Sequence, residues 1–198
     1  MGKGDATREI ILDEAAGLAR QVGLGGLTIG SLATRTGMSK SGLFAHFGSK
    51  ESMQLQVLDH ETDRFTSEVV RPALSAPRGE PRVRALFEGW LAWDSADGGC
   101  PLVAAAFELD DQPGPVRDRL LHNQRDWFDT LATIASTGVA EGHFRPDTDP
   151  RQFAQDIEGI MLAFHVASRL LSDPDAAARA RRGLDALLAA AASVPAAP

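Results

Sequence analysis

The chain has 198 residues, one cysteine and a formal net charge of −7 at pH 7. Hydrophobic residues make up 43% and charged residues 24% of the sequence, which is enough apolar material for a globular core and excludes wholesale disorder. One cysteine excludes an intramolecular disulfide framework, so a reducing, cytoplasmic location is expected. The N-terminal sequence has no apolar signal segment, and no run of about 18 apolar residues predicts a membrane span.

The charge is distributed unevenly along the chain. Residues 1–50 contain six of the 20 Lys and Arg residues but only four of the 27 acidic residues, so this segment is +2 and the remainder is −9. A slightly basic N-terminal part on an acidic body is compatible with phosphate binding by the N-terminal part alone.

Apolar residues recur at helical spacing along almost the whole chain, and no convincing alternating run predicts a strand. The predicted helices cover residues 5–22, 29–35, 39–46, 50–70, 82–95, 102–109, 116–139, 151–171 and 175–192. The fold class is therefore all-α with about nine helices.

Residues 28–47 carry the most specific pattern in the sequence. Thr28 is suited to cap a short helix that Gly37 ends, and Ser39 is suited to cap a second short helix that reaches about His46. Two short helices joined by a tight glycine turn form the helix-turn-helix layout. The expected inward residues are Ile29, Leu32, Ala33, Met38, Leu43 and Phe47.

The second of these helices is expected to enter the major groove of DNA with its outward residues. Those residues are Lys40, Ser41, Gly42, Phe44 and His46. Phosphate contacts are expected beside it from Thr28 and Ser39, which offer hydroxyls at helix N-termini, and from Lys50, whose charge adds to the start of the next helix.

The run from Thr28 through Leu32-Ala33, Gly37-Met-Ser39 and Gly42-Leu-Phe-Ala-His-Phe47 to Gly48-Ser-Lys50-Glu51 resembles the DNA-binding signature of the TetR family of regulators. The resemblance covers roughly the first quarter of the chain. That family usually has Tyr at the position of Phe44, whose hydroxyl commonly touches phosphate, and often a second aromatic where this chain has Ala45. Both departures remove possible backbone contacts.

The resemblance implies a helix-turn-helix domain over residues 1–50 and a ligand-binding and dimerisation domain over residues 51–198. Large apolar residues from four helices, with His165 as a polar group, are candidates for the ligand pocket: Phe87, Trp90, Trp93, Phe107, Trp127, Phe128, Met161, Phe164 and His165. Plain core packing is the alternative for each of them. Small and apolar residues of the last helix are candidates for a two-fold interface, the alternative being packing within the chain: Ala177, Leu184, Leu187, Leu188 and Ala191.

These features predict a homodimeric repressor that binds a palindromic operator in double-stranded DNA and is released by a small hydrophobic or aromatic ligand. No catalytic or cofactor motif occurs, so neither an enzyme nor a cofactor is expected. A helical interaction module without DNA binding is the alternative function. Two further readings stay open: Asp59, His60, Glu61 and Asp63 form either a metal site or a solvated helix face, and Cys100 is either a redox sensor or an inert side chain.

Overall fold

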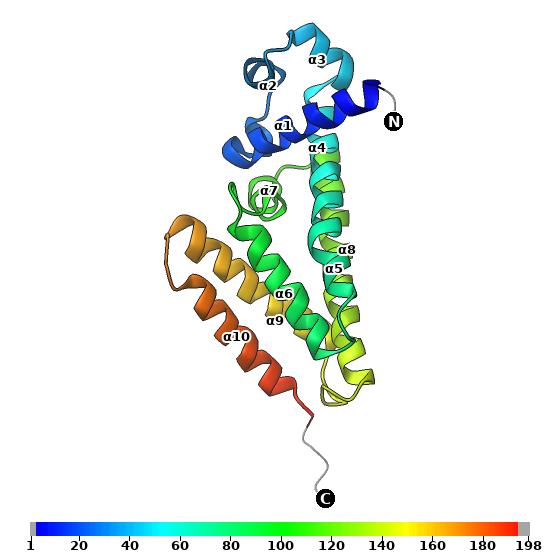
Figure 1. Ribbon diagram of the computed structural model, residues 1–198, viewed down its shortest axis with the longest axis vertical. Helices are drawn as coiled ribbons and strands as arrows, with labels where there is room; N and C mark the ends of the chain where they lie inside the picture. Colours follow the sequence, from blue (N-terminus) through cyan, green and yellow to red (C-terminus); the bar gives the residue numbers. More distant parts are fainter. Residues whose placement is uncertain (1–2, 194–198) are drawn as a thin grey trace, which may run out of the picture. The chain divides into compact units, whose positions relative to one another are not determined.

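Figure 1 shows the computed structural model of the chain, in which residues 3–193 are described. The elements in this range are α1 (Lys3–Gly26), α2 (Ile29–Thr36), α3 (Lys40–Phe47), α4 (Lys50–Phe65), η1 (Thr66–Val70), α5 (Arg71–Leu74), α6 (Glu80–Ser95), α7 (Pro101–Leu109), α8 (Pro115–Ala140), α9 (Pro150–His165), η2 (Val166–Leu170) and α10 (Ala176–Ala191). Within residues 3–193, strand-like pairing is limited to an isolated bridge between Phe144 and Ala192. The predicted all-α class is confirmed.

Contacts divide the described residues into two compact units. Unit 1 comprises the residues up to Arg64 together with Cys100–Asn123, and unit 2 comprises Phe65–Gly99 together with the residues from Gln124 onward. This grouping differs from the expected division at residue 50, because α4 and α7 pack with the N-terminal helices rather than with the rest of the C-terminal chain. No helix among the described residues is long and apolar enough to cross a bilayer.

The two short helices form where the sequence places their caps. Thr28 Oγ1 accepts a hydrogen bond from Ser31 N at 3.0 Å, and Ser31 Oγ accepts one from Thr28 N at 3.1 Å, so a reciprocal capping box begins α2. Gly37 ends α2 in the left-handed conformation with φ 69°. Ser39 Oγ accepts from Gly42 N at 3.1 Å at the start of α3. The predicted caps are confirmed.

The core of unit 1 is built from one face of each of its helices. Its buried members come from α1 to α4, from α7 and from the first turns of α8: Ile11, Ala15, Ala16, Ala19, Leu24, Leu27, Leu32, Ala33, Leu43, Phe47, Met53, Val57, Leu58, Ala105, Leu109 and Leu120. Burial of a Leu or Phe side chain stabilises a fold by about 1.5–3 kcal/mol. This core therefore fixes which face of α3 is left to solvent.

Two helices continue beyond their predicted ends. The helix predicted to stop at Val22 resumes after a break at Gly23, whose φ of 78° and ψ of 165° are not helical. The helix predicted to stop at Val70 widens into the π-helical turn η1 and restarts as α5, where Pro72 stands in the first turn and its missing N–H costs nothing.

Candidate DNA-binding surface and effector site

The outer face of α3 agrees only in part with the sequence prediction. Lys40, Ser41 and Phe44 are exposed, and Phe44 retains 57% of its accessible surface although it is aromatic. Gly42 and His46, which were also expected to face outward, are half-buried because they stand beside the inward Leu43 and Phe47. Ala45 is exposed and was missed, although its position four residues after Ser41 places it on the same helical face.

Lys40 lies back along α2 instead of extending straight out from α3. Its Nζ is 3.9 Å from the point that a Cβ on Gly30 would occupy, and Thr28 Oγ1 is 3.7 Å from the same point. Gly30 belongs to the first turn of α2, where backbone N–H groups lack helical partners. A primary ammonium, a hydroxyl and a helix N-terminus therefore stand together, which is the chemistry that binds phosphate.

Lys50 makes a contact inside unit 1 that the sequence did not predict. Its Nζ donates a hydrogen bond to Gly25 O at 2.5 Å, and the neighbouring Gln54 Nε2 donates to Leu24 O at 2.7 Å. The ammonium is exposed and has three donors, so this contact uses only part of its capacity. Lys50 thus holds the end of α1 in addition to any role at phosphate.

Three of the four polar residues singled out on α4 form ion pairs, most of which join it to other helices of unit 1. Glu61, only 2% exposed, accepts from Arg20 at 2.5 Å and from Arg64 at 3.4 Å, and His60 contacts Asp13 at 2.9 Å. Asp59 pairs with Arg119. The solvated-face prediction is therefore wrong for Glu61, and among the described side chains no group of three His, Cys, Asp or Glu could hold a metal ion.

An aromatic cluster occupies the core of unit 2. Phe65, which the sequence analysis did not single out, packs edge-on against Trp93 at a centroid distance of 5.7 Å and against Trp127 at 5.2 Å. Trp90 packs edge-on against Phe164 at 6.1 Å. The structure thus brings together predicted pocket residues from α6, α8 and α9. Phe87 and Met161 are also buried in unit 2, and Phe128 is half-buried.

Phe107 does not belong to this cluster. It lies on α7 in unit 1 and is 60% exposed, so its predicted place in a pocket with the other aromatic residues is wrong. The inward face of α7 is formed by Ala105 and Leu109, and Phe107 stands between them on the opposite side of the helix. Cys100, just before α7, is 2% exposed, which does not suit an accessible redox thiol.

Two acidic side chains accompany the aromatic cluster. Asp94 is fully buried and its Oδ1 lies 2.6 Å from His165 Nδ1, while Glu158, 7% exposed, accepts a hydrogen bond from Trp127 Nε1 at 2.8 Å. Burial raises the pKa of Glu158 because desolvation disfavours the charged carboxylate, and the Trp127 hydrogen bond offsets this only in part. His165 therefore has a buried acidic partner, and α9 carries polar groups into an otherwise apolar core.

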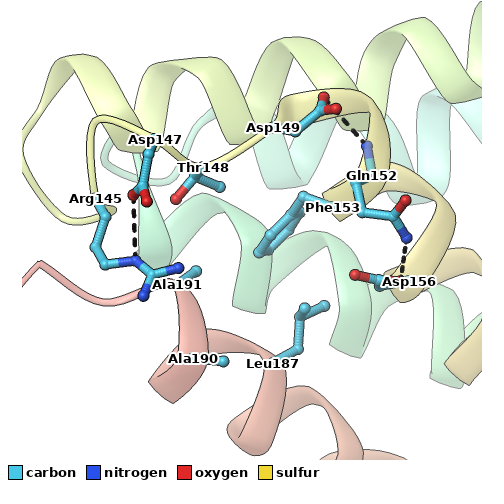
Figure 2. Close-up of a pocket in the computed structure, with 10 residues that line it drawn as sticks. All are labelled: Arg145, Asp147, Thr148, Asp149, Gln152, Phe153, Asp156, Leu187, Ala190 and Ala191. Carbon is cyan, nitrogen blue, oxygen red and sulfur yellow. Dashed lines mark hydrogen bonds and ion pairs between the residues drawn. The ribbon is translucent and has the colours of Figure 1, made fainter.

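Among the described residues of unit 2, two open surface hollows have linings that include none of the predicted pocket residues. Figure 2 shows the first, of about 190 Å³, between the start of α9 and the end of α10. In it Arg145 faces Asp147 at 3.4 Å, and Gln152 Nε2 donates to Asp156 at 2.8 Å. The second, of about 400 Å³, is lined by Leu74 and residues of α8 between Asp126 and Ile134.

The residues predicted for the dimer interface divide into two groups. Leu184, Leu188 and Ala191 are at most 6% exposed, because α10 packs this face on α9 of its own chain. That part of the prediction is therefore corrected to internal packing. Ala177 and Leu187 are half-buried and keep some accessible surface.

Together, a capped helix-turn-helix and a separate helical unit with an aromatic core define a DNA-binding regulator with an effector domain. Residues 11–57 match the family model described as bacterial regulatory proteins, tetR family, and residues 79–184 match the tetracyclin repressor-like C-terminal domain. The chain belongs to the TetR family of transcriptional regulators, whose members are DNA-binding proteins and not enzymes. The family binds operator DNA and small-molecule effectors and acts as dimers.

Individual relatives extend the similarity over most of the chain. The HTH-type transcriptional repressor KstR2 of Mycobacterium tuberculosis is 27% identical over 154 residues, which cover 75% of this chain and 74% of that protein. The A-factor receptor protein of Streptomyces griseus is 25% identical over 87% of this chain and 57% of its own length. A TetR transcriptional regulator from Chloroflexus aurantiacus is 26% identical, with a TM-score of 0.84 over 96% of both chains.

Proposed function

We propose that this protein is a homodimeric repressor that places α3 in the major groove of a palindromic operator and leaves it when a small ligand binds unit 2. The observation that carries the proposal is the exposed outer face of α3, with Lys40, Ser41 and Phe44 free of core contacts beside a capped helix N-terminus. In a two-fold dimer, two such helices meet successive major grooves about 34 Å apart.

Phosphate binding is assigned to Lys40 and Thr28 at the start of α2, with Ser39 and Lys50 beside them. The proximity of Lys40 and Thr28 to Gly30 supports this assignment. Base reading is assigned to Ser41, Phe44 and Ala45, which present a hydroxyl and apolar atoms to the groove. Gly42 and His46 then serve mainly to pack α3 against the neighbouring helices.

The dimer contact is assigned to the outward sides of α9 and α10, which pack side by side (Figure 1). The exposed residues Gly159, Ala163, Val166 and Leu170 recur at helical spacing along α9 and η2, and Ala186 and Ala190 are exposed on α10. Small side chains allow two helix pairs to approach closely in a four-helix contact. Ala177 and Leu187 are assigned to the edge of this surface.

The effector site is assigned to the aromatic cluster of unit 2. Trp127 and His165 are half-buried, so both are partly accessible, and each holds a buried carboxylate. The π-helical turns η1 and η2 follow Phe65 and His165 directly, and such turns are frequent at functional sites. Aromatic side chains with a few polar groups beside them favour a hydrophobic or aromatic ligand that also forms hydrogen bonds.

Fluorescence anisotropy with DNA from the gene's own neighbourhood tests the proposal. Saturable binding to a short palindrome, weakened steeply by salt, supports the repressor. If the purified dimer binds none of this DNA at low salt, the alternative of an interaction module without DNA binding replaces it.

A further inference from the structure

Glu108, near the end of α7, binds two successive backbone amides at the end of α1. Its Oε2 accepts a hydrogen bond from Leu24 N at 2.8 Å, and its Oε1 accepts one from Gly25 N at 2.6 Å. Charge-assisted hydrogen bonds of this length are about twice as strong as neutral ones. The carboxylate therefore joins two elements that are more than 80 residues apart in sequence.

The backbone at this point is shaped to receive the carboxylate. Gly23 has φ 78°, so the chain leaves helical geometry and two consecutive N–H groups turn toward one acceptor. A Cβ at Gly23 or Gly25 would overlap the Glu108 carboxylate. The space that Glu108 occupies thus explains why both positions are glycine.

The carbonyls of the same two residues accept hydrogen bonds from a third helix. Gln54 donates to Leu24 O, and Lys50 donates to Gly25 O. Both donors lie on α4, so the peptide groups of Leu24 and Gly25 are fixed between α7 and α4. Leu27 and the capping residue Thr28 follow after one further residue, which means that this short segment sets where α2 begins.

We infer that Glu108 is a positioning residue for DNA binding: it latches α7 to the α1–α2 junction and so fixes the orientation of α2 and α3. The inference rests on the proposed function for its DNA-binding consequence. Glu108 lies within residues 79–184, which match the C-terminal family model, whereas the amides that it binds lie within residues 11–57, which match the N-terminal one. The latch is therefore a direct connection from the effector-domain sequence to the DNA-reading helices.

When Glu108 is replaced by a neutral residue, electrostatic repulsion and the latch predict opposite changes in DNA affinity. Removing a negative charge near a DNA-binding surface strengthens DNA binding, because repulsion of phosphate falls. Loss of the latch weakens DNA binding, because α2 and α3 must then be ordered when the DNA binds. The direction of the change in affinity therefore separates a positioning role from a charge effect.

The test compares full-length Glu108→Ala and Glu108→Gln with Asp111→Ala, an exposed carboxylate just after α7 that gives the same charge change. We expect Glu108→Ala to bind operator DNA about tenfold more weakly and to exchange the Leu24 and Gly25 amide hydrogens at least tenfold faster. Glu108→Gln should fall between, because its amide oxygen still accepts one hydrogen bond. Asp111→Ala should bind as tightly as the parent or more tightly.

Gly25→Ala provides a second route, because its added methyl displaces the carboxylate while Glu108 is retained. It should show the same faster exchange at Leu24. The latch is refuted if amide exchange in Glu108→Ala equals that of the parent, or if the folded variant binds DNA as Asp111→Ala does. Failure of the parent to bind any DNA would instead refute the proposed function, and the exchange measurement would still decide whether the latch exists.

Discussion

Replacement of Lys40 by Ala is expected to flatten the salt dependence of operator binding. Each phosphate contact on duplex DNA contributes a slope of about −0.9 to log affinity against log salt. A two-fold dimer carries two copies of Lys40, so Lys40→Ala should reduce the steepness by about 1.8. Between 50 and 200 mM salt, a fourfold change, the parent should then lose about 12-fold more affinity than the variant.

Fluorescence anisotropy titrations on one palindromic duplex, at four or more salt concentrations, measure this slope. Arg78→Ala is the matched control, because Arg78 is 67% exposed and belongs to unit 2. It removes the same charge and should leave the slope unchanged. Equal slopes for the parent and Lys40→Ala would show that the ammonium beside Gly30 contacts no phosphate.

Three further substitutions test separate parts of the structure. Ser39→Ala removes the acceptor for Gly42 N and should lower the free energy of unfolding by about 1 kcal/mol, seen as a melting temperature about 2–4 °C lower. Ser39→Gly should cost only a few tenths of a kcal/mol. Equal losses in the two variants would contradict the capping role. Glu158→Gln tests the raised pKa of Glu158. The free energy of unfolding of the parent should fall as pH rises above 4.5 through the native pKa, because the buried carboxyl must then ionise. Urea unfolding at several pH values should show that the variant lacks this contribution. Parallel pH profiles for parent and variant would contradict it. Ala163→Glu places a charge on the assigned dimer surface and should yield monomers in sedimentation velocity. Ala104→Glu, which places the same charge on the exposed side of α7 in unit 1, serves as the comparison and should stay dimeric. Dimers that persist in Ala163→Glu would exclude this surface.

Features decided by a few neighbouring residues could be predicted from the sequence. The caps at Thr28 and Ser39 and the turn at Gly37 depend on local hydrogen bonds, and the structure forms them as expected. The all-α class follows from helical periodicity in the same way.

Features decided by packing between distant segments could not be predicted. Phe107 and Leu184 are both large apolar residues on helices, yet one is exposed and the other is buried within its own chain. The pattern of apolar residues indicates that each such helix has an inward face, but it does not indicate which neighbouring element that face contacts. Glu108 is similar, since nothing beside it in sequence indicates that its partners are the amides of Leu24 and Gly25.

The central claim is that the outer face of α3 enters the DNA groove, and Ser41→Glu tests it most directly. Ser41 is exposed in the first turn of α3, where an acidic side chain interacts favourably with the helix dipole, so the variant should fold and melt as the parent does. A carboxylate facing the groove should lower operator affinity at least about 100-fold, through repulsion by phosphate and lost base contacts. Operator affinity that stays at the parent value in the folded variant would show that another surface binds the DNA.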